Sequence, residues 1–148
     1  MGTTYLIKVV PSQNSSLYKQ ELKKEIDQLL ENINDEMSTY RPDSVLSQFN
    51  QSKEDKPFPI TDNMVQVIKA GLEISRQTQG AFDMTIGPLV NLWGFGPKKK
   101  TEVPPQAQIQ KVMSYTGHDK IELVDGKLRK KRPEVYLDLS AIAKGLAV

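Results

Sequence analysis

The centre of this chain reads Gly80-Ala81-Phe82-Asp83-Met84-Thr85-Ile86-Gly87-Pro88-Leu89-Val90-Asn91-Leu92-Trp93-Gly94-Phe95-Gly96-Pro97, with four of the nine glycines and the only tryptophan. A core strand excludes so much glycine and proline, and a solvated linker would not carry so many large apolar side chains. The stretch therefore predicts a buried loop whose backbone approaches another group closely, with Asp83 as a candidate acid in an apolar wall. A packed, turn-rich loop without a ligand explains the same residues equally well.

The composition around this stretch is that of one globular domain or a large part of one. The chain has 148 residues, of which 38% are hydrophobic and 26% charged, with a net charge of +2. The sequence has no dominant basic stripe, so it does not predict nucleic-acid binding. The run Lys98-Lys99-Lys100 is most simply a solvated loop. The absence of cysteine excludes disulfides, thiolate metal sites and cysteine nucleophiles. No apolar run approaches the roughly 18 residues of a membrane helix.

Two long helices dominate the first half of the predicted fold. Alternation over residues 3–10 predicts a strand, and the apolar spacing over residues 17–37 predicts a long amphipathic helix. A polar break follows, and then a short helix through Phe49 that Asp43 or Ser44 would cap. Asp62 is the expected N-cap of a second helix, which ends before Gly80.

The second half predicts helix and then antiparallel strands. Prolines favour a helix over 106–113, and Asp125-Gly126 predicts a hairpin over 121–129. Residues 135–139 predict a strand, after which Ser140 would cap a helix beginning at Ala141. We therefore expect an α+β fold with long helices packed on a mainly antiparallel sheet. Because the chain enters a strand at once and stops inside a helix, we expect both of its ends to be cut.

Three further sites carry candidate chemistry. A helix start offers free N–H groups to anions, so Lys144 could contact a phosphate and Asp138 could accept a hydrogen bond from a ligand. A capped helix with a surface lysine explains that segment without a ligand. Tyr40 follows the first long helix and suits stacking on a planar ring, although an ordinary helix stop has the same pattern. His118 is most simply a turn residue.

Four blocks together carry a family resemblance. They are the opening Met1-Gly2-Thr3-Thr4-Tyr5, the region from Met37-Ser38-Thr39-Tyr40 to Ser47-Gln48-Phe49-Asn50, the glycine-rich stretch 80–97, and residues 138–145. In content and order they resemble the FAD:protein FMN transferase (ApbE) family over the whole chain, and the resemblance implies that residues 1–148 are the N-terminal portion of a single domain. Members bind FAD and, with magnesium, transfer its FMN half to a threonine of an acceptor protein. Some relatives instead hydrolyse FAD to FMN and AMP.

The resemblance implies a set of site residues. Flavin contacts of the family match Met1, Tyr40, Ala81, Phe82, Asp83, Asp138 and Lys144, and the backbone oxygen of Ala141 matches a magnesium ligand. The implied cofactors are therefore FAD and Mg²⁺, and magnesium prefers such oxygen ligands. The residue that performs the chemistry is not indicated. The family's main magnesium ligands, an aspartate and threonine cluster, lie beyond Val148, and Ser140-Ala141 stands where many members have glycines.

The resemblance also implies partners and a location. Family members are exported and often lipid-anchored at the bacterial membrane, which predicts a periplasmic or otherwise extracytoplasmic protein. The expected partners are an acceptor subunit of a redox-driven ion pump and the C-terminal remainder of the same protein, without nucleic acid. Three interpretations remain open: part of a flavin transferase or FAD pyrophosphatase, a non-catalytic flavin-binding module, or a structural half that needs its complement to fold.

Overall fold

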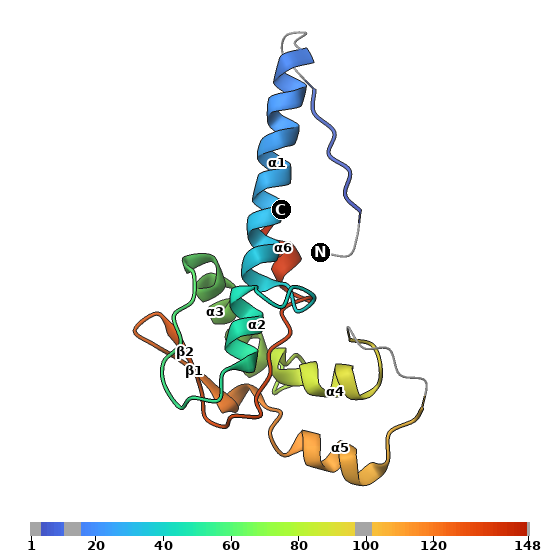
Figure 1. Cartoon of the computed structure of the whole chain (residues 1–148), viewed down its shortest axis with the longest axis vertical. Coiled ribbons are helices and arrows are strands. Elements are labelled where there is room, and N and C mark those ends of the chain that lie inside the picture. Colours follow the sequence, from blue (N-terminus) through green and yellow to red (C-terminus); the bar gives the residue numbers. More distant parts are fainter. Residues whose placement is uncertain (1–3, 11–15, 97–101, 148) are drawn as a thin grey trace.

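The structure is a computed structural model that describes residues 4–10, 16–96 and 102–147. One long helix rises from a body of shorter elements, and the segment 4–10 runs beside it (Figure 1). The elements in chain order are α1 (Ser16–Met37), α2 (Val45–Gln51), α3 (Asp62–Gln77), the 3₁₀ turn η1 (Met84–Ile86), α4 (Gly87–Leu92), α5 (Gln106–Met113), the 3₁₀ turn η2 (His118–Lys120), β1 (Ile121–Val124), β2 (Lys127–Lys130) and α6 (Ala143–Leu146). The expected α+β class is confirmed.

The helices begin at side chains that accept hydrogen bonds from the first helical turn. Ser44 caps α2 by accepting from the N–H of Ser47, one of the two caps that the sequence offered. Thr61, not Asp62, caps α3, because its hydroxyl accepts from the N–H of Met64 and Asp62 is already the first helical residue. The predicted helix over 106–113 is α5.

Strands β1 and β2 form the predicted antiparallel hairpin, paired from Ile121↔Lys130 to Val124↔Lys127. Asp125 and Gly126 both have positive φ, 50° and 74°, as the two-residue turn requires. Phe58 adds a single bridge to the edge of β2 through two hydrogen bonds with Leu128, of 2.8 and 2.9 Å. The hairpin is thereby joined to the loop between α2 and α3.

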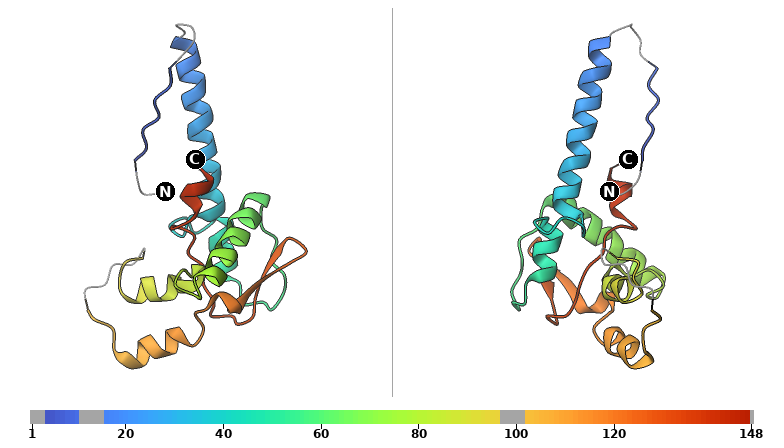
Figure 2. Two further views of the ribbon diagram at one scale, coloured as in Figure 1. Left: turned by 180° about the vertical axis from the view of Figure 1, so that it is seen from behind. Right: turned by 45° about the vertical axis from the view of Figure 1, so that its right-hand side comes forward.

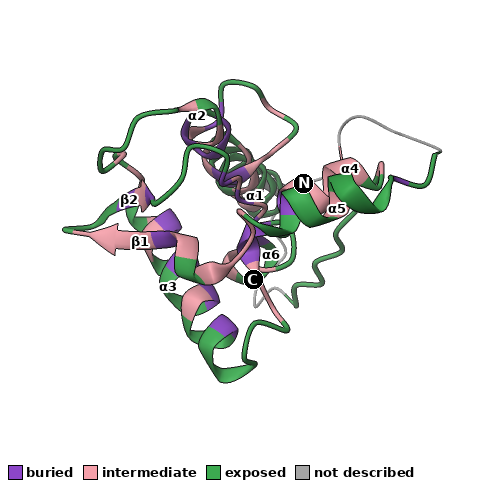
Figure 3. Ribbon diagram, turned by 90° about the horizontal axis from the view of Figure 1, so that it is seen from below, coloured by how far each residue is buried: buried purple, intermediate pink, exposed green. Residues whose placement is uncertain are grey.

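One hydrophobic core lies where the lower end of α1 meets α2, α3 and the hairpin, and the buried residues concentrate there (Figure 3). Its members come from most elements of the body: Met37, Leu46, Phe49, Met64, Val67, Ile68, Met84, Ile121, Leu128, Val135, Leu137, Leu139 and Ala143. Phe49 and Phe58 pack edge to face with ring centroids 5.7 Å apart. The first turns of α1 project beyond this core, as the two views of Figure 2 show.

Two predicted strands are corrected by the structure. Residues 4–10 pair with no strand in the described part of the chain, and Leu6 and Val10 are 82% and 96% exposed. Thr3, the first residue of that prediction, lies outside the described residues. Residues 135–139 are extended and bury every second side chain, but they too lack a strand partner among the described residues. Alternation of apolar and polar residues indicates which face of a segment is buried. A strand also needs a neighbouring strand to which its backbone can hydrogen-bond.

The glycine-rich stretch is also corrected, because it is not a continuous buried loop. It contains η1 and α4, and Pro88 occupies a position in the first turn of α4 that proline tolerates well. Trp93 and Phe95 after α4 are 42% and 80% exposed. Its glycines do permit close approach, since a Cβ on Gly87 would lie 2.5 Å from Cδ1 of Tyr136.

Candidate functional site

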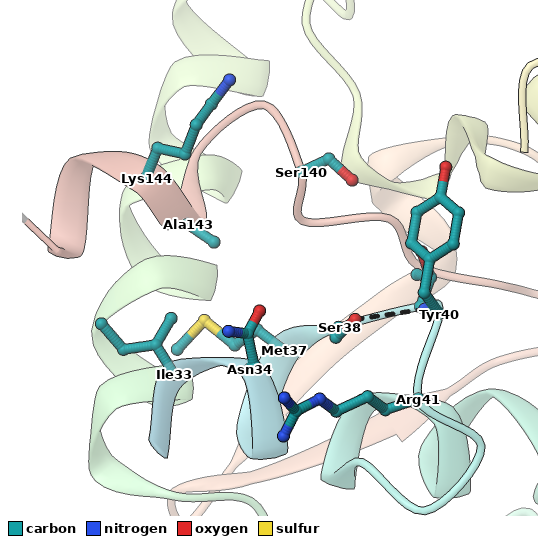
Figure 4. Close-up of a pocket in the computed structure, with 10 residues that line it drawn as sticks. Ile33, Asn34, Met37, Ser38, Tyr40, Arg41, Ser140, Ala143 and Lys144 are labelled. Carbon is teal, nitrogen blue, oxygen red and sulfur yellow. Dashed lines mark hydrogen bonds between the residues drawn. The ribbon is translucent and has the colours of Figure 1, made fainter. Parts of the chain in front are cut away.

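A cavity of about 540 Å³ lies between the C-terminal end of α1, the turn that follows it, and α6 (Figure 4). Its apolar lining comes from Ile33 and Met37 of α1 and Ala143 of α6. The polar lining comprises Asn34, Ser38, Thr39, Tyr40, Arg41, Ser140 and Lys144. Cavities of this size and mixed character hold small organic ligands.

The turn that carries Tyr40 is fixed by hydroxyl groups at the start of α2. The carbonyl of Ser38 accepts hydrogen bonds from the hydroxyls of Ser44 and Ser47, at 2.6 and 3.2 Å. The N–H of Tyr40 in turn donates to the hydroxyl of Ser38 at 3.2 Å. Tyr40 is 67% exposed at the edge of the cavity, so its ring face is available to a planar ligand.

The two cationic side chains of the cavity, Arg41 and Lys144, differ in whether a carboxylate is paired with them. Arg41 donates to Glu31 at 2.7 Å and also to Asp35, and these hydrogen bonds raise the pKa of its guanidinium. Lys144 is exposed, and no carboxylate of the described residues forms an ion pair with it. Lys144 and Tyr40 lie on opposite sides of the cavity, with Ser140 between them (Figure 4). An anionic ligand would therefore meet Lys144 rather than a neutralised arginine.

The segment before α6 differs from its prediction. Oδ1 of Asp138 accepts from the N–H of Ser140 at 2.8 Å and also from its hydroxyl, so Asp138 stabilises this turn and Ser140 does not cap the helix. Helix α6 begins at Ala143, two residues later than predicted. Ala141 is exposed within the turn.

The candidate residues of the glycine-rich stretch lie outside this cavity. Oδ1 of Asp83 accepts two hydrogen bonds of 2.7 Å from Thr85, one from its N–H and one from its hydroxyl. The Thr85 hydroxyl accepts from the N–H of Gly117 at 2.6 Å, so Asp83 organises a buried polar turn. Ala81 is exposed, and Phe82 packs against the edge of the core.

The structure thus brings together part of the predicted set. Tyr40 and Lys144 line one cavity, and Asp138 and Ala141 flank its Ser140 wall. The glycine-rich stretch joins this region through the N–H of Asp138, which donates to the carbonyl of Met84 at 2.8 Å. Met1 lies outside the described residues.

Sequence reasoning gave no role to Asn50 or Tyr136. The Asn50 side chain binds the backbone of Leu137, and only its place in a family block hinted at a function. The Tyr136 ring packs against Gly87, and burial raises the pKa of its hydroxyl. No local pattern distinguishes Tyr136 from an ordinary aromatic of a strand.

No three histidine, aspartate or glutamate side chains within 4–10, 16–96 and 102–147 gather closely enough to hold a metal ion. Over the same residues, every helix falls short of the length and apolarity that crossing a bilayer requires.

Comparison with known proteins places this geometry in a family. A model of the ApbE family matches residues 1–148. The chain belongs to the ApbE family. A curated relative named FAD:protein FMN transferase from Vibrio cholerae is 44% identical across all of this chain, which covers 44% of that protein. A relative of the same name from Haemophilus influenzae is 40% identical, again over all of the chain and 44% of the relative.

Solved structures of the ApbE family share the fold. A flavin transferase ApbE from Vibrio cholerae matches with a TM-score of 0.86 and 42% identity, over 95% of this chain and 45% of that one. The apo form of the flavinyl transferase ApbE from Pseudomonas stutzeri matches with a TM-score of 0.83 and 34% identity, over 88% and 42% of the two chains. The chain thus spans less than half the length of these relatives.

Proposed function

We propose that this chain is the N-terminal portion of an enzyme that transfers FMN from FAD to a threonine of an acceptor protein. The observation that carries the proposal is the cavity that unites Tyr40 and Lys144 in a chain of the ApbE family. An aromatic surface can stack on a planar flavin or adenine ring, and a cation attracts a pyrophosphate. The cavity offers both on opposite sides.

The chain's own residues would bind and orient FAD. Tyr40 would stack on a ring of the ligand, and Lys144 would attract a phosphate oxygen. Asp138 would hold the turn that carries Ser140 and Ala141 against the ligand. In the reaction, the threonine oxygen attacks the FMN phosphorus, the bond from that phosphorus to the bridging oxygen breaks, AMP leaves, and the hydroxyl proton is released. Holding these atoms in line supplies much of the rate enhancement.

Magnesium belongs to this proposal only through the family resemblance. It would neutralise charge on the pyrophosphate, with the carbonyl of Ala141 among its ligands. The described residues do not by themselves match a metal site, because no acidic or histidine cluster accompanies Ala141. No step of the proposed reaction is therefore assigned to a metal ion.

We also propose an extracytoplasmic setting, with a lipid-anchored parent protein and an acceptor subunit of a redox-driven ion pump as partner. The names of the relatives support a protein acceptor, since FAD:protein FMN transferase states one. The resemblance alone supports the location, the anchor and the pump.

The test uses the complete gene product with FAD, magnesium and a threonine-bearing acceptor protein. We expect covalent flavin fluorescence on the acceptor and release of AMP. Release of FMN and AMP without labelling of the acceptor would instead identify an FAD pyrophosphatase. Binding of FAD without either product would identify a non-catalytic module.

Calorimetry tests the assigned ligand contacts in the same protein. We expect FAD to bind more tightly than FMN, because the cavity contacts both ring and phosphate. Lys144→Met should weaken FAD binding at least tenfold, since hydrogen bonds to charged groups contribute about 1.5–3 kcal/mol. Lys131→Met, at an exposed lysine outside the cavity, is the matched control. Equal affinity for the two flavins, or equal effects of the two variants, would contradict the assignment.

A further inference from the structure

The side chain of Asn50 forms both backbone hydrogen bonds of one residue in the segment 135–139. Its Nδ2 donates to the carbonyl of Leu137 at 2.9 Å, and its Oδ1 accepts from the N–H of Leu137 at 2.8 Å. A neighbouring strand would satisfy Leu137 through the same two bonds. The carboxamide therefore takes the place of a strand partner on this side of the segment.

The opposite side of the segment is held as firmly. The N–H of Asp138 donates to the carbonyl of Met84 at 2.8 Å. Val135, Leu137 and Leu139 are 1%, 0% and 0% exposed, so the alternate side chains are locked in the core. The segment is thus clamped between α2 and η1, directly before the turn that leads to Ser140 and Lys144 at the cavity.

Asn50 is itself fixed at the end of α2. The ammonium of Lys130 donates to the carbonyl of Asn50 at 3.0 Å and to that of Ser52 at 2.8 Å. It also lies 4.9 Å from the centroid of the Phe49 ring. Lys130 is only 3% exposed, so the ammonium that fixes the end of α2 is itself buried and held in place.

We infer that Asn50 is a positioning residue for the proposed flavin transfer, and that its carboxamide sets where the turn 138–144 lies against FAD. The inference rests on the proposed function. Asn50 does not line the cavity, so it acts through Leu137 and Asp138 rather than by touching the ligand. A displacement of about 1 Å at a reacting group can cost about 100-fold in rate. The two hydrogen bonds from Asn50 to Leu137 prevent such a displacement of the turn 138–144.

The experiment compares three variants in the complete gene product. Asn50→Leu keeps the size of the side chain and removes both hydrogen bonds to Leu137. Asn50→Asp keeps the acceptor for the N–H of Leu137 and sets a carboxylate oxygen against its carbonyl. Gln51→Leu is the control, because Gln51 is the exposed neighbour on the same helix and donates to Pro42 at 3.2 Å instead.

The measurement is kcat/KM for FAD per folded molecule, well below the Tm of each variant. We expect at least a tenfold fall for Asn50→Leu and less than a twofold change for Gln51→Leu. A residue that only stabilises the fold would lower Tm and leave kcat/KM of the folded fraction unchanged. A folded Asn50→Leu enzyme within twofold of wild type overturns the inference.

The pH profile of Asn50→Asp gives a second readout, which decides the matter if Asn50→Leu does not fold. A protonated carboxyl group offers one donor and one acceptor, as the amide does. The ammonium of Lys130 and the hydroxyl of Tyr136 are the titratable groups beside this position. The ratio of Asn50→Asp to wild-type kcat/KM should therefore rise as pH falls through the pKa of the introduced carboxyl group, and a ratio that stays flat across that pKa overturns the inference. A wild-type protein that neither binds FAD nor transfers FMN would refute the proposed function itself, whereas equal activity of wild type and Asn50→Leu refutes only the role of Asn50.

Discussion

Gly87→Ala tests how tightly the glycine-rich stretch packs against the segment before α6. The added Cβ would lie 2.5 and 2.9 Å from Cδ1 and Cε1 of Tyr136, and 3.4 Å from Cβ of Asp138. Carbon atoms prefer about 3.5–4.0 Å, so the ring must move by about 1 Å. Overpacking of this kind costs about 1–3 kcal/mol, against which alanine gains up to about 1 kcal/mol in helix propensity.

Gly145→Ala isolates the steric cost, because Gly145 lies in α6 and a Cβ there meets nothing within 4 Å. Urea unfolding of the complete gene product gives the free energy of unfolding of each variant. We expect Gly145→Ala to be neutral or slightly stabilising, and Gly87→Ala to be less stable than it by about 1–3 kcal/mol. A Gly87→Ala protein as stable as Gly145→Ala would refute the packing argument.

Three further outcomes are expected. Asp83→Asn should lower FMN transfer about tenfold or more, because the family resemblance gives Asp83 a flavin contact and a charged hydrogen bond of about 1.5–3 kcal/mol to the ligand would be weakened. Its Tm should change little, because asparagine keeps the acceptor that Thr85 uses; full activity, or a collapse of Tm, would contradict this. Burial lowers the pKa of the Lys130 ammonium to about 8. Between pH 8 and 10 this lysine is therefore mostly deprotonated in the folded protein, whereas it stays protonated in the unfolded chain. The stability of wild type relative to Lys130→Met should therefore rise between pH 8 and 10 by up to about 1.4 kcal/mol per pH unit, and a difference that does not change over this pH range would contradict the burial of that ammonium. Residues 1–148 alone should not transfer FMN, and supplying the C-terminal portion that the relatives have should restore transfer; activity of the 148-residue chain alone would contradict the proposal that the C-terminal portion completes the site.

The sequence predicted elements whose signals are local. The apolar spacing of α1, the hydroxyl of Ser44 and the Asp125-Gly126 turn each act within a few residues, and each prediction is confirmed. Strand pairing is not local. Residues 4–10 and 135–139 have the alternation of strands, yet neither pattern identifies a partner, and an asparagine side chain takes that place at Leu137.

The candidate site was predictable to the extent that each residue has a distinctive local setting. Tyr40 after a long helix and Lys144 near a helix start were proposed separately, and they line one cavity. The sequence could not show that Arg41 is neutralised by Glu31 and Asp35, because that depends on how the turn folds back on α1. The predicted flavin roles of Ala81, Phe82 and Asp83 stay predictions.

The clamp at Leu137 has a consequence for the order in which the protein is made. Asn50 leaves the ribosome 87 residues before its partner, an interval of roughly 4–17 s at ordinary rates of synthesis. During that time α2 can form, but Leu137 and Leu139, which complete the core around Phe49, have not yet been joined to the chain. Because contacts so distant in sequence form late, the nascent protein carries an unfinished apolar surface until Leu137 and Leu139 emerge, and this is the interval in which a chaperone would bind it.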